Sequence, residues 1–301
     1  MILTPEILEN KQVRHLAAVI SVMCSDKERN YSFADYAKNH DADSNGHISE
    51  NHLQDYEHSQ QLLITWCFKV VDRFTIQREI VSITMSFVDR FISAHHQFSN
   101  HKALKLVTVS ALHLAVKVHE PQMLHKLGIL PVLSKGEFQM EHIIRMELLI
   151  LQSLAWRLYP PTTLSFIMHF MELLKFSLPH SASHLSAEDV VEVASFFSEL
   201  EVFDYTLASV KPSLVAFAAI LNAMEHLSSV VRSGACGTCE RSIECLTSFF
   251  PLLADDREQL EAIRSRLWML YDGAGGFASC ETGLSASIPR RSPVSITAAL
   301  R

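Results

Sequence analysis

The residues whose spacing most resembles a metal-binding loop lie between Asp41 and His52. Calcium-loop positions one, three, five and six are taken by Asp41, Asp43, Asn45 and Gly46. The twelfth position, where calcium needs a bidentate carboxylate, holds His52, and the sequence has no second loop of this kind to pair with the first. We therefore interpret the segment as a solvated polar loop, with calcium binding as the alternative.

Three cysteines near the C-terminal end could offer soft ligands to zinc. Cys236 and Cys239 form a C-x-x-C pair, Cys245 follows six residues later, and His226 is the nearest imidazole. A structural zinc site needs four ligands, and the sequence has no second C-x-x-C pair. An ordinary loop with reduced thiols is the preferred interpretation, so we expect no metal and no cofactor.

A lysine and a glutamate have a placement that suggests binding of a partner. Leu106, His113 and Lys117 are spaced seven and four residues apart, which puts them within about 20° of one helical stripe. Glu147 stands in a helix that is otherwise almost entirely apolar, where a lone carboxylate is costly to bury. Two explanations stay open. Glu147 pairs inside the fold with Arg145, Lys117 or a backbone amide, or Lys117 and Glu147 meet at the surface and together hold a partner.

Composition argues against catalysis, nucleic-acid binding and membrane insertion. The 301 residues include only 9 Gly and 10 Pro, and neither G-x-G-x-x-G nor G-x-x-x-x-G-K-[ST] occurs. We find no nucleophile beside a base, so we expect no enzyme. The 26 Lys and Arg against 33 Asp and Glu give a net charge of −7, which disfavours nucleic acid. No stretch of about 18 uncharged apolar residues is present, and the N-terminus lacks the pattern of a secretory signal.

The periodicity of apolar residues predicts an all-α fold built from two sets of five helices. The first set is expected over Gln54–Phe74, Glu79–Ser93, Lys102–His119, Met123–Leu133 and Gln139–Leu158. The fourth of these is short, because Gly128 and Pro131 interrupt it. The fifth is apolar almost all round, which predicts a central helix surrounded by the others.

A break at Tyr159–Thr162 separates the two sets, since Pro160 and Pro161 disfavour helix in the residues before them. Thr162 or Thr163 can cap the helix that follows, and Ser186 can cap a later one. The second set is expected over Leu164–Phe176, Ala187–Tyr205, Pro212–Ser228, Glu240–Leu253 and Arg257–Tyr271.

These patterns predict four domains or segments. Residues 1–54 form an N-terminal extension that is partly helical, over Pro5–Met23 and Tyr31–His40. Residues 55–158 and 159–272 form the two bundles. Residues 273–301 are rich in Gly, Ala and Ser and are expected to be a disordered tail.

Three stretches resemble a cyclin box, the helical repeat of the cyclin family. LLITWCFKVVDRFTIQREIVSITMSFVDRFIS (Leu62–Ser93) is similar to its first two helices. ALHLAVKVHEP (Ala111–Pro121) is similar to the end of its third, and MELLILQSLAWRLYPPT (Met146–Thr162) to its fifth and the following linker. The similarity covers about residues 55–225. HEP and FFSELEVFDY resemble divergent cyclins of diatom-type algae.

The resemblance implies a non-catalytic subunit that binds and activates a cyclin-dependent serine/threonine kinase and controls cell-cycle progression. The kinase-contacting positions of the family correspond here to Lys117, Glu147, Asp89 and Leu106, and an arginine of the family is replaced by Gln60. The rival interpretation is a cyclin-fold transcription factor or helical scaffold that binds DNA or another protein. The negative charge argues against DNA.

Many cyclins dock substrate or inhibitor peptides on a patch of the first helix. Its apolar part is kept as Leu62, Leu63 and Trp66, although Trp66 alone is more typical of a core. Ser59 replaces a methionine of the family, and Lys69 replaces the acid that meets a basic peptide residue. This reversal indicates a different peptide preference, or none.

The tail contains Ser292 before Pro293, which a proline-directed kinase could phosphorylate, though such sites also arise without function. The cysteine usage and the family resemblance lead us to expect a location in the nucleus, the cytoplasm or both.

Overall fold

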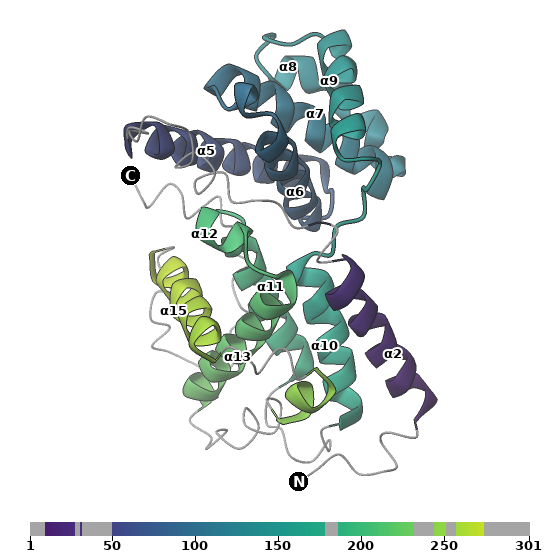
Figure 1. The fold of residues 1–301 in the computed structure, drawn as a ribbon, viewed down its shortest axis with the longest axis vertical. Coiled ribbons are helices and arrows are strands. Elements are labelled where there is room, and N and C mark those ends of the chain that lie inside the picture. The colour runs from purple at the N-terminus through teal and green to yellow at the C-terminus, as the bar shows by residue number, and fades with distance from the viewer. Residues whose placement is uncertain are drawn as a thin grey trace. The chain divides into compact units, whose positions relative to one another are not determined.

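The computed structural model describes residues 10–27, 31, 50–177, 186–231, 244–250 and 257–273. Every regular element in these ranges is a helix, which confirms the predicted all-α class (Figure 1). The described residues form two compact units. The first lies within residues 31–160 and 202–209, and the second within 10–27, 161–201 and 210–273.

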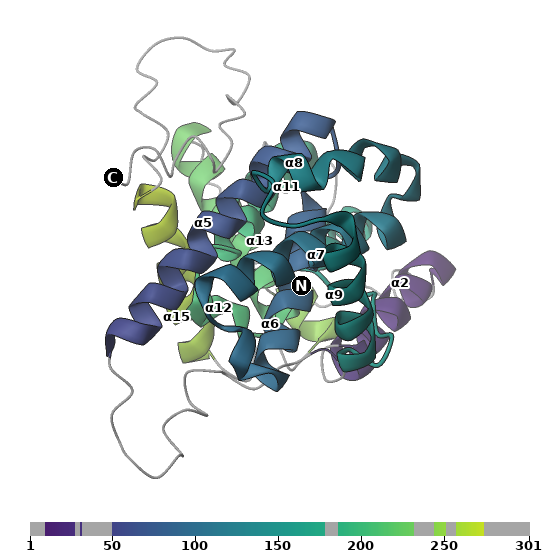
Figure 2. The same cartoon turned by 90° about the horizontal axis from the view of Figure 1, so that it is seen from above.

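The first unit is built around one buried helix. Its elements are α5 (Glu50–Phe74), α6 (Glu79–Ala94), η2 (His96–Phe98), α7 (His101–His119), η3 (Pro121–Ile129), α8 (Leu130–Leu133) and α9 (Met140–Ser153). Helix α7 packs against α5, α6, η3 and α9 (Figure 2). It is buried without interruption from Val107 to Val116. The largest buried side chains of the unit include Phe68, Phe87, Phe91, Leu104 and Leu112.

The prediction that the fifth helix is central was wrong, because α7 takes that place. Helix α9 buries only Ile143, Met146, Glu147 and Ile150, which form one face. Ile144, Leu148 and Leu149 are exposed. The apolar composition of α9 therefore exceeds what its own core requires.

Three predicted helix boundaries also need correction. The helix predicted over Ala187–Tyr205 ends at Glu201, and Tyr205 begins a separate turn of helix over Tyr205–Ala208. The fourth helix is mostly a 3-10 helix, η3, followed by the single turn α8, because Gly128 and Pro131 interrupt regular α-helix. The fifth helix ends at Ser153 and does not reach Leu158, because Ala155 and Trp156 adopt left-handed backbone angles, with φ of 48° and 59°.

Contacts from other helices hold the segment that follows α9. The guanidinium of Arg90 donates to the carbonyl of Arg157 over 3.0 Å. His119 Nε2 lies 2.8 Å from the carbonyl oxygen of Leu158, and the rings of His119 and Tyr159 meet edge to face. These contacts support a left-handed tryptophan that is unfavourable on its own.

The second unit is arranged around α13 (Pro212–Val231). Its other elements are α2 (Lys11–Val22), the π-helical turn η1 (Met23–Lys27), α10 (Thr163–Ser177), α11 (Ala187–Glu201), a helix over residues 244–249, and α15 (Arg257–Gly273). Helix α13 packs against α10, α11 and α15, and α2 packs against α10. The short α12 (Tyr205–Ala208) belongs to the first unit, where Phe203 stacks on Phe68.

The predicted starts of α10, α11 and α13 are confirmed, whereas the start expected at Glu240 lies outside the described residues. Thr162 is the cap of α10, since its hydroxyl accepts from the amide of Ser165 while the Ser165 hydroxyl accepts from the amide of Thr162. The Ser186 hydroxyl accepts from the amide of Glu188, and Pro212 is the first residue of α13.

Several sequence predictions lie outside the described residues. They are the helix over Tyr31–His40 beyond Tyr31 itself, the loop of Asp41, Asp43, Asn45 and Gly46, the pair Cys236 and Cys239, Ser292, and the tail beyond Gly273. Cys245 is described and is buried in the helix over residues 244–249.

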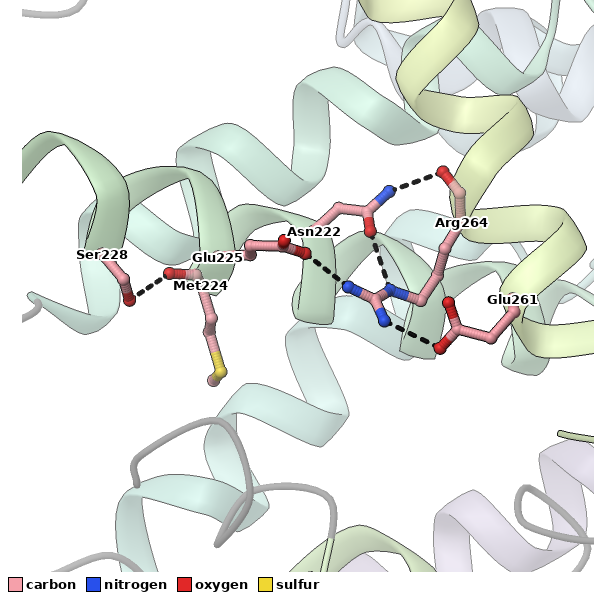
Figure 3. A network of polar contacts seen from close by, with 6 residues as sticks. All are labelled: Asn222, Met224, Glu225, Ser228, Glu261 and Arg264. Atoms are coloured by element: carbon pink, nitrogen blue, oxygen red, sulfur yellow. Dashed lines mark hydrogen bonds and ion pairs between the residues drawn. The ribbon is translucent and has the colours of Figure 1, made fainter. Parts of the chain in front are cut away.

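A buried polar network joins α13 to α15 (Figure 3). Asn222 is fully buried; its amide donates to the carbonyl of Arg264 over 3.0 Å, and its oxygen accepts from Arg264 Nε over 2.9 Å. The same guanidinium donates to Glu225 and Glu261 at the surface. Asn222 is thus the only buried partner of Arg264 among the residues drawn in Figure 3.

We predict that Asn222→Ala lowers the free energy of unfolding by about 2–3 kcal/mol, because it strands the Nε–H of Arg264 and removes a second hydrogen bond to the Arg264 carbonyl. The matched control Glu261→Ala removes an exposed partner of the same guanidinium and should cost less than about 1 kcal/mol. Urea denaturation followed by circular dichroism measures both. Equal losses for the two variants would contradict the role of Asn222.

Candidate functional site

The side chains of Lys117 on α7 and Glu147 on α9 meet, and a histidine joins them. Lys117 Nζ donates to Glu147 Oε2 over 2.9 Å. Glu147 Oε1 is in short contact with Nδ1 of His113, which lies one turn before Lys117 on α7. The side chain of Glu147 is 4% exposed and that of Lys117 is 47% exposed. The buried carboxylate thus fixes a lysine whose side chain is about half exposed.

Two hydrogen bonds keep Glu147 ionised inside the bundle. Burial by itself would raise the pKa of the Glu147 carboxyl group. The hydrogen bonds from His113 and Lys117, together with the charges of these two residues, outweigh burial, so the pKa lies below its ordinary value. Glu147 therefore carries a negative charge at neutral pH, and this charge attracts the ammonium of Lys117.

Of the two explanations left open by the sequence, the structure fulfils the first. Glu147 is satisfied within the fold by Lys117 and also by His113, and no hydrogen bond joins it to Arg145. The pair nevertheless borders the surface, because Lys117 remains half exposed. The geometry is therefore also compatible with a partner that contacts the lysine.

An exposed apolar strip lies beside Glu147 on α9. At about 100° per residue, Leu151, Ile144 and Leu148 lie about 40°, 60° and 100° from Glu147 around the helix. Ile144 and Leu148 are exposed, and Leu151 is partly buried. Trp156, just beyond the end of the helix, is exposed as well. Exposed apolar residues grouped in this way are typical of a protein interface.

The structure places Asp89 and Gln60 inside the first unit. Gln60 Nε2 donates to Asp89 Oδ1 over 2.8 Å, and both residues are buried. Burial raises the pKa of the Asp89 carboxyl to about 7, and the hydrogen bond from Gln60 lowers it only in part. This bond holds α5 against α6 and leaves little of either side chain for a partner to touch.

The remaining predicted residues occupy mixed positions. Leu106 is partly buried against the core of the first unit. Of the predicted docking patch, Leu62 is exposed, Trp66 is partly buried against the core, and Leu63 is buried within it. Leu63 therefore packs in the core and is not accessible to a docked peptide.

Sequence reasoning missed the role of two residues. His113 was placed on the stripe of Lys117, but its bond to Glu147 was not predicted. The signal was present, because a histidine one turn before Lys117 on the same stripe can reach the same carboxylate. Trp156 was assigned to a helix, whereas it lies beyond the end of α9 with a left-handed backbone and is exposed.

The described residues include neither a candidate metal-binding cluster nor a helix suited to span a membrane. No three His, Cys, Asp or Glu side chains gather there in a way that could hold a metal ion. None of the helices in the same ranges has the length and apolar content needed to cross a bilayer.

Two adjoining family models match the chain. "Cyclin, N-terminal domain" matches residues 32–159, and "Cyclin, C-terminal domain" matches residues 161–271. The chain belongs to the cyclin family. The two matches cover both helical bundles, so the family and tandem cyclin fold expected from the sequence are confirmed.

Similar proteins include B-type cyclins from Oryzias latipes and Oryza sativa. The chain is 29% identical to the G2/mitotic-specific cyclin-B2 of Oryzias latipes over 178 residues, which cover 58% of this chain and 42% of that cyclin. It is 31% identical to Cyclin-B1-1 of Oryza sativa subsp. japonica, over 53% of this chain and 34% of that protein. The chain thus spans less than half the length of these relatives.

Solved structures agree with this fold. A viral cyclin from herpesvirus saimiri has a TM-score of 0.52 at 19% identity, over 72% of this chain and 88% of the viral one. A chain in the CAK complex from Chaetomium thermophilum bound to ATP-gamma-S has a TM-score of 0.50 at 14% identity, over 85% of this chain and 74% of that one. At these identities the likeness concerns the cyclin fold alone.

The Asp89–Gln60 bond leads to a prediction about pH. The folded chain keeps a proton on Asp89 up to about pH 7, whereas the unfolded chain loses it near its ordinary pKa of 3.8. The contribution of Asp89 to the unfolding free energy therefore falls as the pH rises through this window, by up to about 1.4 kcal/mol per pH unit.

Asp89→Asn should remove this contribution, because asparagine still accepts from Gln60 but carries no charge. The stability of the variant relative to the wild type should rise between about pH 4 and about pH 7 and level off above this range. Urea denaturation at several pH values measures the difference. A difference that stays constant across this range would show that Asp89 is not held in its neutral form.

Proposed function

We propose that this chain binds and activates a cyclin-dependent serine/threonine protein kinase and contributes no catalytic group of its own. The observation that carries the proposal is the surface formed by Lys117, the exposed Ile144 and Leu148, and the partly buried Leu151. We call it the α7–α9 surface. Membership of the cyclin family supports a kinase as the partner.

In this proposal Glu147 acts through Lys117. Both carboxylate oxygens of Glu147 are engaged, one by His113 and one by Lys117. A lysine ammonium has three N–H donors, and Lys117 uses one on Glu147, which leaves two directed at solvent. These donors suit backbone carbonyl oxygens of a partner, such as those at the end of a helix.

The strip on α9 supplies the apolar part of the contact. Burying a leucine side chain is worth about 1.5–3 kcal/mol, so a few such residues provide substantial affinity. The charged pair adds orientation, because Lys117 is already held by its bond to Glu147 before a partner arrives. The surface thus combines apolar affinity with a fixed donor.

Activation follows if the α7–α9 surface binds the active conformation of the kinase more tightly than the inactive one. A protein kinase needs a lysine–glutamate pair completed by a mobile helix, together with an ordered activation loop. A partner that binds the active arrangement more tightly shifts the population toward it, by no more than its difference in affinity for the two states. The chain would supply binding energy only.

We further propose control of cell-cycle progression in the nucleus, the cytoplasm or both. The similarity to a G2/mitotic-specific cyclin of Oryzias latipes supports this role. The proposal includes docking of substrate or inhibitor peptides at Leu62 and Trp66, which are the accessible part of the predicted patch.

Leucines 148 and 149 provide a matched test of the surface. They are 51% and 46% exposed on the same helix, but lie about 100° and 200° around it from Glu147. Leu148→Ala should weaken kinase binding by about 1–2 kcal/mol, whereas Leu149→Ala should change it by less than about 0.5 kcal/mol. Calorimetry with each recombinant cyclin-dependent kinase of the same organism measures this, beside its activity on a short peptide. Equal effects of the two substitutions would overturn the assignment of the surface.

Lys117→Ala should weaken kinase binding by about 2–5 kcal/mol while the bundle stays folded, because the charged contact is lost when the interface is desolvated. Circular dichroism confirms the fold, and the same calorimetry reports the affinity. Unchanged binding and activation by the folded variant would refute the role of Lys117.

A further inference from the structure

One face of α5 joins apolar side chains to cations, and it shares no residue with the α7–α9 surface. Leu62, Trp66, Lys69 and Arg73 are spaced four, three and four residues apart, so they fall within about 60° of one another around the helix. Leu62, Lys69 and Arg73 are exposed, and Trp66 is partly buried. We call these four residues the α5 face.

Contacts at both ends place α7 alongside the α5 face. Near its start, Nδ1 of His101 lies 3.1 Å from the hydroxyl of Ser59. Beyond its end, Glu120 accepts from the amide of Gln77 over 2.7 Å. The two helices therefore run side by side in the same direction, and the first turn of α7 lies near the N-terminal end of the α5 face.

That first turn adds further basic residues. His101 and Lys102 are exposed, and Lys105 is partly buried. They surround one acid, Glu137, whose pKa is lowered first by its hydrogen bond from Lys105 and further by the charges of Lys105, Lys102 and His101. Glu137 balances Lys105, at 2.7 Å, and leaves Lys102 in excess.

At the other end of the α5 face the cations have no acidic partner. Neither Lys69 nor Arg73 forms an ion pair with any residue whose placement is described. Asp72 is paired with Arg78 at 2.5 Å and lies about 80° around the helix from Leu62, and Glu57 lies about 140° away. In a chain of net charge −7, this face is locally positive.

We propose that the α5 face docks an acidic peptide segment, in which a bulky apolar side chain packs on Leu62 and Trp66 and carboxylates of Asp or Glu meet Lys69 and Arg73. The inference rests on the proposed function, because it names the class of peptide taken by a docking patch of a kinase activator. The argument for this occupant is charge complementarity, since a basic peptide would face two unpaired cations.

The distances along α5 predict how many residues separate the apolar anchor of the peptide from its carboxylates. Lys69 lies seven residues beyond Leu62 and Arg73 lies eleven beyond, or about 10 Å and about 16 Å along α5. An extended peptide advances about 3.3 Å per residue. The carboxylates should therefore lie about three and about five residues from the apolar anchor.

The test uses two fluorescein-labelled peptides with one leucine anchor in a Gly/Ser background. One has glutamate three and five residues from the leucine, and the other has lysine there. In fluorescence anisotropy with the full chain at low salt, the acidic peptide should bind about ten-fold more tightly, and added salt should reduce the difference.

The variant Lys69→Glu with Arg73→Glu should invert this preference. The control Lys11→Glu with Lys211→Glu makes the same change in net charge at exposed positions of the second unit and should leave the preference intact. Leu62→Ser should weaken binding of the acidic peptide. The proposal would be overturned if the two peptides bound equally or if the basic one bound more tightly. It would also be overturned if the chain self-associated and Leu62→Ser abolished this self-association.

Kinase binding measured on the same proteins separates the two proposals. The Lys69→Glu, Arg73→Glu chain should still bind and activate the kinase on a short peptide substrate. Kinase activation without selection of the acidic peptide refutes the docking proposal alone. If the chain prefers the acidic peptide but activates no kinase, the proposed function is refuted and the docking site for acidic peptides is retained.

Discussion

The buried carboxylate of Glu147 is the constraint on which the rest of the site depends. An ionised group with only 4% of its side chain exposed must find partners, and here it finds two, His113 and Lys117, on a single neighbouring helix. The arrangement requires α7 and α9 to pack in one register. The same register makes α7 the central helix, leaves one side of α9 uncovered and holds an exposed ammonium beside that side.

The uncovered side of α9 explains why its sequence misled the prediction of its position. Ile143, Met146 and Ile150 face the core of the first unit, and Ile144 and Leu148 face outward. A helix that is apolar all round is either buried within its own fold or partly buried in an interface with a second protein. The sequence cannot distinguish these cases, because hydrophobicity reports burial without saying which chain supplies the neighbour.

Two neutral side chains, Gln60 and Asn222, make buried hydrogen bonds with different consequences in the two units. Where the family resemblance implies an arginine, Gln60 makes a single hydrogen bond to Asp89, so burial of the carboxyl is compensated only in part. In the second unit, Asn222 instead satisfies both an N–H and a carbonyl of Arg264. The first arrangement ties stability to pH, whereas the second joins two helices without a buried charge pair.

The sequence alone determined the helical class, most helix starts, the two bundles and the family, because apolar periodicity, caps and prolines act within a few residues of one another. It also singled out Lys117 and Glu147, 30 residues apart. Only the tertiary structure decided that His113 completes this pair, that Asp89 and Gln60 are buried, and that Trp156 turns outward. These outcomes depend on which faces of separate helices meet, and on left-handed residues that end α9 early; neither follows from local spacing.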